Sequence, residues 1–333
     1  MRRIPVVVVL PPRVLLLDVA GPLEVLRRAN QVQDDVRFEV RYVAATPAVQ
    51  SSIGIGLAPA EGLPARLPDD AWLVVCGDVD DVMLPAGRGH AGRGADAAGE
   101  RALVAWLRAA VRADTTLICI CTGALLAARA GLLDGRACTT HHSSCAELAQ
   151  IAPSARVLEN RLYVADGPCH TSAGITTGID LMLHLVGELT GPSCGAAIAR
   201  YLVVYLRRGG ADPQLSPWLE GRNHVHPAVH RAQDAVAADP ARSWSSGALA
   251  RIACVSDRHL SRLFNEHVGM GVVQYVNHLR IARAHELLSK TRLDMEQVAE
   301  RAGFASVRQF RRAWHRVHEA PPSAARGAPA ATL

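Results

Sequence analysis

The 333-residue chain has few aromatic residues and almost no lysine. Phe, Trp and Tyr make up 4% of the sequence, and Lys290 is the only lysine among 36 basic residues. Hydrophobic residues still make up 49%, so the chain can bury sizeable cores, which must consist mainly of Ala, Val and Leu. At this length we expect two or more domains, because single cores stop growing near roughly 250–300 residues.

Other absences exclude several functional classes. No apolar run reaches the roughly 18 residues of a membrane span, and prolines at 11 and 12 interrupt the apolar start that otherwise resembles a signal peptide. The eight cysteines are too scattered for a disulfide scaffold. The sequence has no Walker loop, no H-E-x-x-H pattern and no complete dinucleotide fingerprint. We therefore expect a cytoplasmic protein without membrane contact, metal or cofactor.

The first two hundred residues alternate between strand and helix patterns. Strands are predicted at 5–10, 36–44, 72–78, 115–121 and 136–141, with a hairpin-like pair around 159–167. Helices are predicted at 21–32, 100–112, after Gly123, at 174–189 and at 193–208, and the Gly/Ala-rich segment 85–99 is expected to be a surface loop. This alternation predicts a flavodoxin-like α/β sandwich with a mainly parallel sheet over residues 1–208.

The remainder of the chain has a different pattern. Residues 209–227 are rich in Gly and Pro and read as a linker. Six short amphipathic helices are then predicted at 228–238, 246–253, 257–267, 271–289, 294–302 and 306–317. They predict an all-α domain at 228–326, followed by a tail at 327–333.

Net charge separates the two parts of the chain. Residues 1–227 hold 21 arginines and 22 acidic residues, a balance of −1, whereas residues 228–333 hold 15 basic and 9 acidic residues, a balance of +6. A basic C-terminal domain favours an anionic partner, above all nucleic acid, although a solvated basic surface is the alternative.

Two segments of the C-terminal domain, 247–269 and 295–318, share one pattern. Each has a short helix, a tight turn at Cys254 or Gly303, and a serine, Ser256 or Ser306, that is expected to cap a second helix. Apolar residues follow each serine by four and eight positions, so one face of the second helix packs on the first. The opposite faces carry Arg258, Ser261 and Arg262 in one copy and Arg308, Arg311 and Arg312 in the other. This is the layout of a helix-turn-helix.

These residues resemble the AraC/XylS family of bacterial transcription regulators over about the last hundred residues. The resemblance rests on S-D-R-H-L-S-R-L-F (256–264), Y-V-N-H-L-R-I-A-R-A-H-E-L-L (275–288), V-A-E-R-A-G-F-A-S (298–306) and A-P-P-S-A-A-R (320–326). It implies that two helix-turn-helix units bind successive major-groove segments of double-stranded DNA. The implied DNA-contacting residues are Arg258, Ser261, Arg262, Val307, Arg308 and Arg312.

Two residues depart from the usual sequence pattern of that family. Ala325 stands where an aromatic residue is usual, and Val307 stands where a polar residue is more common. The second recognition helix is therefore expected to read few bases and mainly to grip phosphate. For each arginine alone, a solvated surface role is the alternative.

Cys121 lies between a predicted strand and a predicted helix. A thiol at such a turn is exposed at the carboxyl edge of the sheet, and the helix dipole and nearby N–H groups favour its thiolate. Gly123 provides the space that a sharp turn needs. Cys121 is therefore either a nucleophile with a neighbouring acid or histidine, or a buried or pocket-lining thiol.

This region resembles the ThiJ/PfpI-like branch of the class-I glutamine amidotransferase-like superfamily over about residues 4–208. The matching segments are VVVVLPPRVLLLDVAGPLEVL (6–26), ICICTGALLAARAGLLDGRACTTHH and TSAGITTGIDLMLHLV (171–186). The resemblance places the nucleophile position at Cys121, the acid at Asp18, Thr122 after the nucleophile and His141 near the pocket. Thr122 replaces the histidine of peptidase-like members, whereas Asp18, Cys121 and Thr122 together resemble the isocyanide hydratase pattern.

The combination of these two domains predicts a one-component transcription regulator rather than an enzyme. Its N-terminal domain is expected to sense a small metabolite or to mediate homodimer formation, and RNA polymerase is a further expected partner. The alternative is a cysteine-dependent hydratase- or amidase-like enzyme that uses Cys121 and Asp18.

Overall fold

The computed structural model describes residues 1–57, 61–79, 93–204, 208–210, 214, 218, 221–222, 224–318 and 320–326. The chain divides into two compact units, Met1–Gln214 and Leu215–Leu333. The predicted tail 327–333, part of the predicted loop (85–92) and part of the predicted linker (211–213, 215–217, 219–220 and 223) lie outside the described residues.

A seven-stranded sheet forms the centre of the N-terminal unit. Its strand order is β11 (Tyr163–Asp166), β12 (Cys169–Ser172), β8 (Thr116–Ile120), β7 (Trp72–Val75), β1 (Arg2–Leu10), β3 (Val36–Ala44) and β6 (Glu61–Gly62). All neighbouring pairs are parallel except β11 and β12, which form an antiparallel hairpin. The mainly parallel sheet predicted from the apolar runs is therefore confirmed.

Smaller β elements flank the main sheet. Strands β2 (Arg13–Val14), β4 (Val49–Ser51) and β5 (Gly56–Leu57) form one small sheet, and β9 (Ala137–Cys138) pairs with β10 (Arg156–Val157). A 3₁₀ turn, η1 (His142–Ser144), follows β9.

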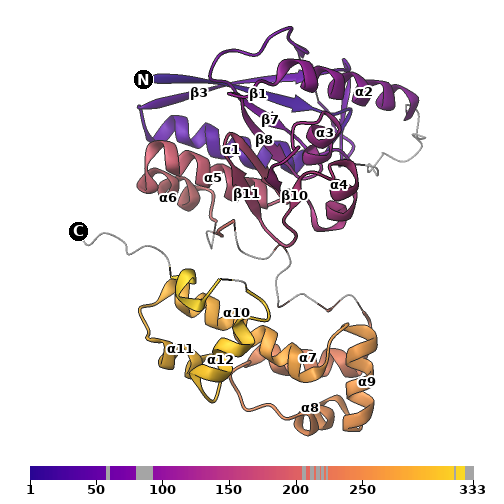
Figure 1. The fold of residues 1–333 in the computed structure, drawn as a ribbon, viewed down its shortest axis with the longest axis vertical. Helices are drawn as coiled ribbons and strands as arrows, with labels where there is room; N and C mark the ends of the chain where they lie inside the picture. Colours follow the sequence, from indigo (N-terminus) through magenta and orange to yellow (C-terminus); the bar gives the residue numbers. More distant parts are fainter. Residues whose placement is uncertain are drawn as a thin grey trace. The chain divides into compact units, whose positions relative to one another are not determined.

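Helices cover both faces of the seven-stranded sheet (Figure 1). One layer contains α1 (Leu16–Val32), α5 (Thr177–Thr190) and α6 (Pro192–Tyr201), and the other contains α2 (Arg93–Ala110), α3 (Gly123–Arg129) and α4 (Cys145–Ile151). Residues of β1 alternate between the two layers, because successive side chains of a strand point to opposite faces. Val6 and Val8 pack in the first layer, whereas Val7 and Val9 pack in the second.

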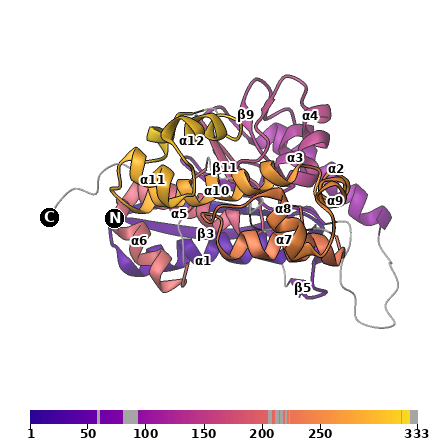
Figure 2. The ribbon, with the colours of Figure 1, turned by 90° about the horizontal axis from the view of Figure 1, so that it is seen from below.

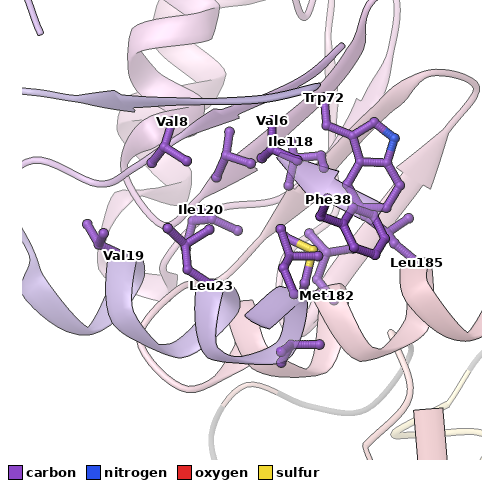
Figure 3. Close-up of a cluster of buried hydrophobic side chains, with 14 of the residues drawn as sticks. Val6, Val8, Val19, Leu23, Phe38, Trp72, Ile118, Ile120, Met182 and Leu185 are labelled. Carbon is purple, nitrogen blue, oxygen red and sulfur yellow. The ribbon is translucent and has the colours of Figure 1, made fainter. Parts of the chain in front are cut away.

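The core beneath α1 and α5 is built almost entirely from aliphatic side chains (Figure 3). Val6 and Val8 of β1 and Ile118 and Ile120 of β8 are at most 1% exposed. The two aromatic rings in this cluster, Phe38 and Trp72, pack against each other with their centroids 5.2 Å apart. The sandwich is thus built with few aromatic residues, as the composition indicates.

Several predicted boundaries in this unit are wrong. The segment 85–99 was expected to be a loop, yet α2 begins at Arg93, because its alanines and Arg93 favour helix over turn. Strand β7 ends at Val75 rather than at 78, and beyond it Asp78 forms only an isolated bridge with Val14. Helix α6 ends at Tyr201, not at 208, and β9 covers only two residues of the predicted strand 136–141.

Helices and 3₁₀ turns are the only regular secondary structure among the described residues of the C-terminal unit. It contains α7 (Pro227–Ala238), α8 (Ser246–Ala253), α9 (Asp257–His267), α10 (Val272–Lys290), α11 (Met295–Arg301), α12 (Val307–Trp314) and the 3₁₀ turn η2 (Pro322–Ala325). Figures 1 and 2 show α10 connecting α7, α8 and α9 with α11 and α12. Two small cores result, one around Phe264 and Tyr275 and the other around Phe310 and Trp314. Each core thus holds one predicted helix pair on a different part of α10.

Among the described residues, no helix is both long and apolar enough to span a membrane.

Candidate functional site

Cys121 lies at the point where β8 meets the start of α3. Its backbone has a positive φ of 55°, a left-handed conformation that is costly for a residue with a side chain. Two hydrogen bonds hold this turn: the N–H of Cys121 donates to the carbonyl oxygen of Ser172 (3.0 Å), and the hydroxyl of Thr140 donates to the carbonyl oxygen of Cys121 (2.9 Å). The strained turn fixes the direction of the thiol at the carboxyl edge of the sheet.

Asp18 and Cys121 are brought together by different elements. Asp18 lies in the first turn of α1 and is fully buried, and its carboxylate faces the thiol of Cys121 and the backbone of Gly77. Carboxylate Oδ1 accepts a hydrogen bond of 2.6 Å from the N–H of Ile175. The two residues that the sequence predicts to act together are therefore neighbours, although they are about a hundred positions apart in the chain.

Burial controls the charge state of both groups. It raises the pKa of Asp18 to about 6, although the hydrogen bond from Ile175 opposes this shift. Burial also raises the pKa of Cys121 to about 12, and the nearby Asp18 carboxylate raises it further. The helix N-terminus favours a thiolate at this turn, whereas burial favours the neutral thiol, next to a carboxyl group whose pKa is raised to about 6. Desolvation at this buried position outweighs the helix dipole.

Glycines that the sequence analysis overlooked enclose the thiol. A Cβ at Gly174 would lie 2.0 Å from Cys121 Cβ, and a Cβ at Gly77 would lie 2.4 Å from Asp18 Oδ2. Both glycines follow strands that flank β8 in the sheet, β12 and β7, and Gly123 follows β8 itself. Glycines directly after adjacent parallel strands are the signal that could have identified them.

The other two predicted site residues have different surroundings. The hydroxyl of Thr122 donates to the carbonyl oxygen of Asp78 (2.8 Å), so it joins the turns after β8 and β7. Nδ1 of His141 lies 2.7 Å from the hydroxyl oxygen of Ser143, and its ring packs on His142. Burial lowers the pKa of His141, and His142 lowers it further. The described contacts of His141 are therefore local.

Two residues beyond α6 are connected to the Cys121 site. The side-chain amide of Gln214 donates to the carbonyl oxygen of Thr140 (2.9 Å), the residue whose hydroxyl binds Cys121. Arg208 pairs with the buried Asp180 and donates to the hydroxyl of Thr176 (3.0 Å), which follows Ile175. We call Arg208 and Gln214 the linker anchors. They attach the start of the linker to the same turns that surround Asp18 and Cys121.

The two predicted helix pairs have closely matched geometry. Ser256 and Ser306 cap α9 and α12, and their hydroxyls accept from the N–H groups of His259 (3.2 Å) and Gln309 (3.2 Å). These predicted caps are confirmed. The predicted apolar positions are buried, with at most 2% exposure: Leu260, Phe264, Phe310 and Trp314. The matching serine caps and buried apolar residues therefore place α9 and α12 in the same way within their helix pairs.

The turns of the two pairs differ in their left-handed residue, in their length and in their packing. The first pair has Cys254 in a left-handed conformation (φ 57°), and the second has Gly303 (φ 91°). After Cys254 two residues lead to helix α9, whereas after Gly303 three residues lead to α12. A Cβ at Gly303 would lie 2.6 Å from the backbone of Ala241, so only glycine fits there. The second turn is thus one residue longer and more tightly enclosed.

Arg280 connects the two pairs through α10. Its guanidinium donates to the carbonyl oxygens of Pro240 and Arg242, both at 2.9 Å, and lies 5.9 Å from the ring centroid of Phe304. The segment that it holds includes Ala241, which contacts Gly303. Arg280 therefore fixes the segment between α7 and α8 against the turn of the second pair.

The residues predicted to contact DNA differ in exposure. Arg258, Arg262, Arg308 and Arg312 are exposed, as is Arg311. Ser261 is half-buried, and Val307 is half-buried because it packs against the core around Phe310. The arginines thus offer side chains to a partner, while Val307 also has a packing role.

No group of three His, Cys, Asp or Glu side chains within the described part of the chain has the arrangement of a metal site. All eight cysteines are free thiols, and Cys254 is the exposed one.

Comparison with known proteins assigns both units. Residues 5–188 match the DJ-1/PfpI family, and residues 249–328 match a helix-turn-helix domain. The HTH-type transcriptional regulator GbdR of Pseudomonas aeruginosa is 29% identical over 92% of this chain and 80% of its own length. The HTH-type transcriptional regulator CdhR of the same organism is 33% identical over 69% of this chain and 70% of its own length. An isonitrile hydratase of Pseudomonas putida is 33% identical over 54% of this chain and 69% of its own length.

Proposed function

Since the chain belongs to the DJ-1/PfpI family and is an HTH-type transcriptional regulator of the AraC kind, we propose that its N-terminal unit senses a small molecule at the Asp18–Cys121 site. The same proposal assigns base and phosphate contacts on double-stranded DNA to the exposed arginines of α9 and α12. Ligand binding at the first site changes how the two helix pairs engage DNA.

The contacts of the linker anchors carry the sensing proposal. Thr140 binds both Cys121 and Gln214, and the turn that donates to Asp18 through Ile175 also binds Arg208 through Thr176. A ligand that displaces this turn alters contacts of the linker within one or two residues. A buried carboxyl with a pKa of about 6 suits recognition of a polar, nitrogen-containing molecule, because it can be donor or acceptor near neutral pH.

Arginine is well suited to the proposed DNA contacts. Its planar guanidinium can donate two parallel hydrogen bonds to guanine or to a phosphate. Arg262 and Arg312 occupy equivalent positions, six residues after the capping serines, and both are exposed. Arg258, Arg308, Ser261 and Val307 complete the proposed contact set.

We place the regulator in the cytoplasm, where its DNA is accessible, and propose that it acts as a homodimer and contacts RNA polymerase at its target promoters. Two-fold pairing would present four helix pairs to a pseudo-palindromic or repeated site.

The DNA-binding part is tested by substitution. Arg262→Ala and Arg312→Ala should each weaken binding to a mapped genomic target about tenfold or more, because a good bidentate contact contributes about 1–3 kcal/mol. Each should also lower the slope of log affinity against log salt by about 1 if the arginine grips a phosphate. Arg156→Ala, an exposed arginine of the N-terminal unit, is the charge-matched control. Unchanged binding by both variants would exclude the assigned residues.

The sensing part is tested by titration. Small nitrogenous metabolites are added to the protein–DNA complex, and the affinity of the full-length chain is compared with that of Cys121→Ala. We expect at least one to change the affinity, and the change to disappear in the variant. If no compound changes the affinity and Cys121→Ala behaves as wild type in cells, the N-terminal unit serves dimer formation alone.

A hydratase-like enzyme is the second candidate function, because Asp18, Cys121 and Thr122 lie together and a relative bears the name isonitrile hydratase. In such an enzyme Asp18 would move the proton and Cys121 would attack the substrate carbon. The enclosed neutral thiol disfavours this role. Steady consumption of an isonitrile by the full chain, lost in both Cys121→Ala and Asp18→Asn, would establish it.

A further inference from the structure

A cavity of about 470 Å³, open to solvent, lies on the surface of the C-terminal unit, on the side of α9 that carries Ser261. Its walls are formed by two hydroxyl groups, two amide side chains, one guanidinium and the first turn of α10, and none of its lining residues is acidic. The lining residues are Ser246, Ser261, Gly271, Val272, Val273, Gln274, Asn277 and Arg316.

Helices α8, α9 and α10 and the segment after α12 contribute to this cavity. Ser246 is the first residue of α8, Ser261 lies on α9, and Arg316 is the second residue after the end of α12. Arg316 comes four residues after Arg312, and Ser261, itself a proposed DNA contact, directly precedes Arg262, so lining residues are close in sequence to both proposed recognition arginines. An occupant would therefore contact the two helix pairs at once.

The chemistry of the lining selects an anion. Arg316 supplies a permanent positive charge and up to five N–H donors. Ser246 and Ser261 add hydroxyl donors, and Gln274 and Asn277 add amide donors. No aromatic ring that could stack on a base is among the lining residues, so the cavity fits a phosphate better than a nucleobase.

The first turn of α10 strengthens this selection. Gly271 caps the helix without a side-chain hydrogen bond, and the first backbone bond of the helix runs from the N–H of Tyr275 to the carbonyl oxygen of Gly271. The N–H groups of residues 272–274 therefore lack partners within the helix, and these three residues line the cavity. The dipole of this 19-residue helix adds partial positive charge at the same place.

We propose that this cavity holds one backbone phosphate of DNA, located between the two major-groove segments that α9 and α12 enter. The inference rests on the proposed DNA-binding function and adds Arg316, Ser246 and Gln274 to the residues that perform it. A phosphate held between the two pairs fixes the register of the duplex relative to both, because phosphate contacts position a protein without reading bases.

The test uses the full-length chain and a non-specific duplex of about three helical turns. Arg316→Gln should lower the slope of log affinity against log salt by about 0.9, the value for one lost phosphate contact. Gln274→Glu should weaken binding several-fold more than Gln274→Met, because the carboxylate repels the phosphate. Arg292→Gln, an exposed arginine that does not line the cavity, should leave the slope unchanged.

A second measurement locates the phosphate. Neutral methylphosphonate groups replace single phosphates along a mapped genomic target. One replacement between the two contacted major grooves should weaken wild-type binding but leave the affinity of Arg316→Gln unchanged. The inference is wrong if Arg316→Gln keeps the wild-type slope while Arg262→Ala loses affinity, since DNA binding then holds without this site. If neither variant changes binding, the contacts assigned to Arg262 and Arg316 are both wrong; the proposed DNA-binding function itself fails only if the wild-type chain does not bind the duplex.

Discussion

The side-chain amide of Gln214 donates a hydrogen bond to the carbonyl oxygen of Thr140 over 2.9 Å. Gln214 also donates to the carbonyl oxygen of Arg161 (3.0 Å), so one side chain holds two segments that lie beside the Cys121 turn. Removing this amide leaves two carbonyl oxygens without that donor. Through these two hydrogen bonds, a movement of the Cys121 turn would displace the linker, and a movement of the linker would displace the turn.

Gln214→Ala should loosen the backbone around Thr140. Each lost hydrogen bond contributes about 1 kcal/mol, so amides of residues 139–142 should exchange with solvent about five- to tenfold faster. Hydrogen exchange followed by mass spectrometry measures this directly. Gln31→Ala, at an exposed position of α1, is the control and should leave these amides unaffected. Equal exchange in both variants would mean that Gln214 does not stabilise this turn.

Cys121 should react slowly with alkylating reagents. Only the thiolate reacts, and a pKa of about 12 leaves very little of it at pH 8, while the side chain is also only 5% exposed. Cys254 is exposed and provides an internal reference within the same molecule. Iodoacetamide labelling, followed by peptide mass spectrometry, should show Cys121 modified at least about a hundredfold more slowly than Cys254. Comparable rates would indicate an accessible thiolate.

Asp18→Asn should change the pH dependence of stability. Folding raises the pKa of Asp18 from 3.8 to about 6, so the folded state binds more protons than the unfolded state between these values. This group therefore stabilises the fold increasingly as pH falls below 6, and the contribution is lost as pH rises above 6. Relative to Asp18→Asn, the wild type should gain about 1 kcal/mol between pH 8 and pH 5. Denaturant unfolding of both chains at the two pH values measures the difference, and an equal pH dependence would argue against the raised pKa.

Gly303→Ala and Cys254→Gly should have opposite effects on the stability of the C-terminal unit. Gly303→Ala places a Cβ 2.6 Å from Ala241 at a positive φ and should lower the free energy of unfolding by about 2 kcal/mol or more. Cys254→Gly relieves the same left-handed conformation at an exposed position and should raise the free energy by up to about 1 kcal/mol. Thermal unfolding of the full-length chain measures the change in stability that each substitution causes. A stabilising Gly303→Ala would contradict the close contact with Ala241.

Much of the fold follows from local patterns in the sequence. The unbroken apolar run of β1 predicts a strand covered on both faces, and the serine caps predict where α9 and α12 begin. The regulator assignment is confirmed by relatives that align over most of the chain. These predictions succeed because periodicity and capping depend on neighbouring residues.

The details of the Cys121 site depend on distant residues and could not be predicted. A helix N-terminus next to Cys121 suggests a thiolate, but burial raises the pKa of the thiol, and the close segments around Gly77 and Gly174 belong to distant parts of the sequence. The contacts of Gln214 with Thr140 and Arg161 likewise join residues that are 74 and 53 positions apart. The roles of Asp18 and Cys121 stay predictions until a ligand is identified.

The extra residue between Gly303 and α12 has a practical consequence for engineering. A residue in the first helix of one pair is matched by the residue 49 positions later, whereas residues in the second helices are matched 50 positions apart. Protein engineers who wish to transplant specificity from α9 to α12 must therefore graft from the capping serine onward, since copying the whole motif in one register would turn the wrong side chains toward the bases.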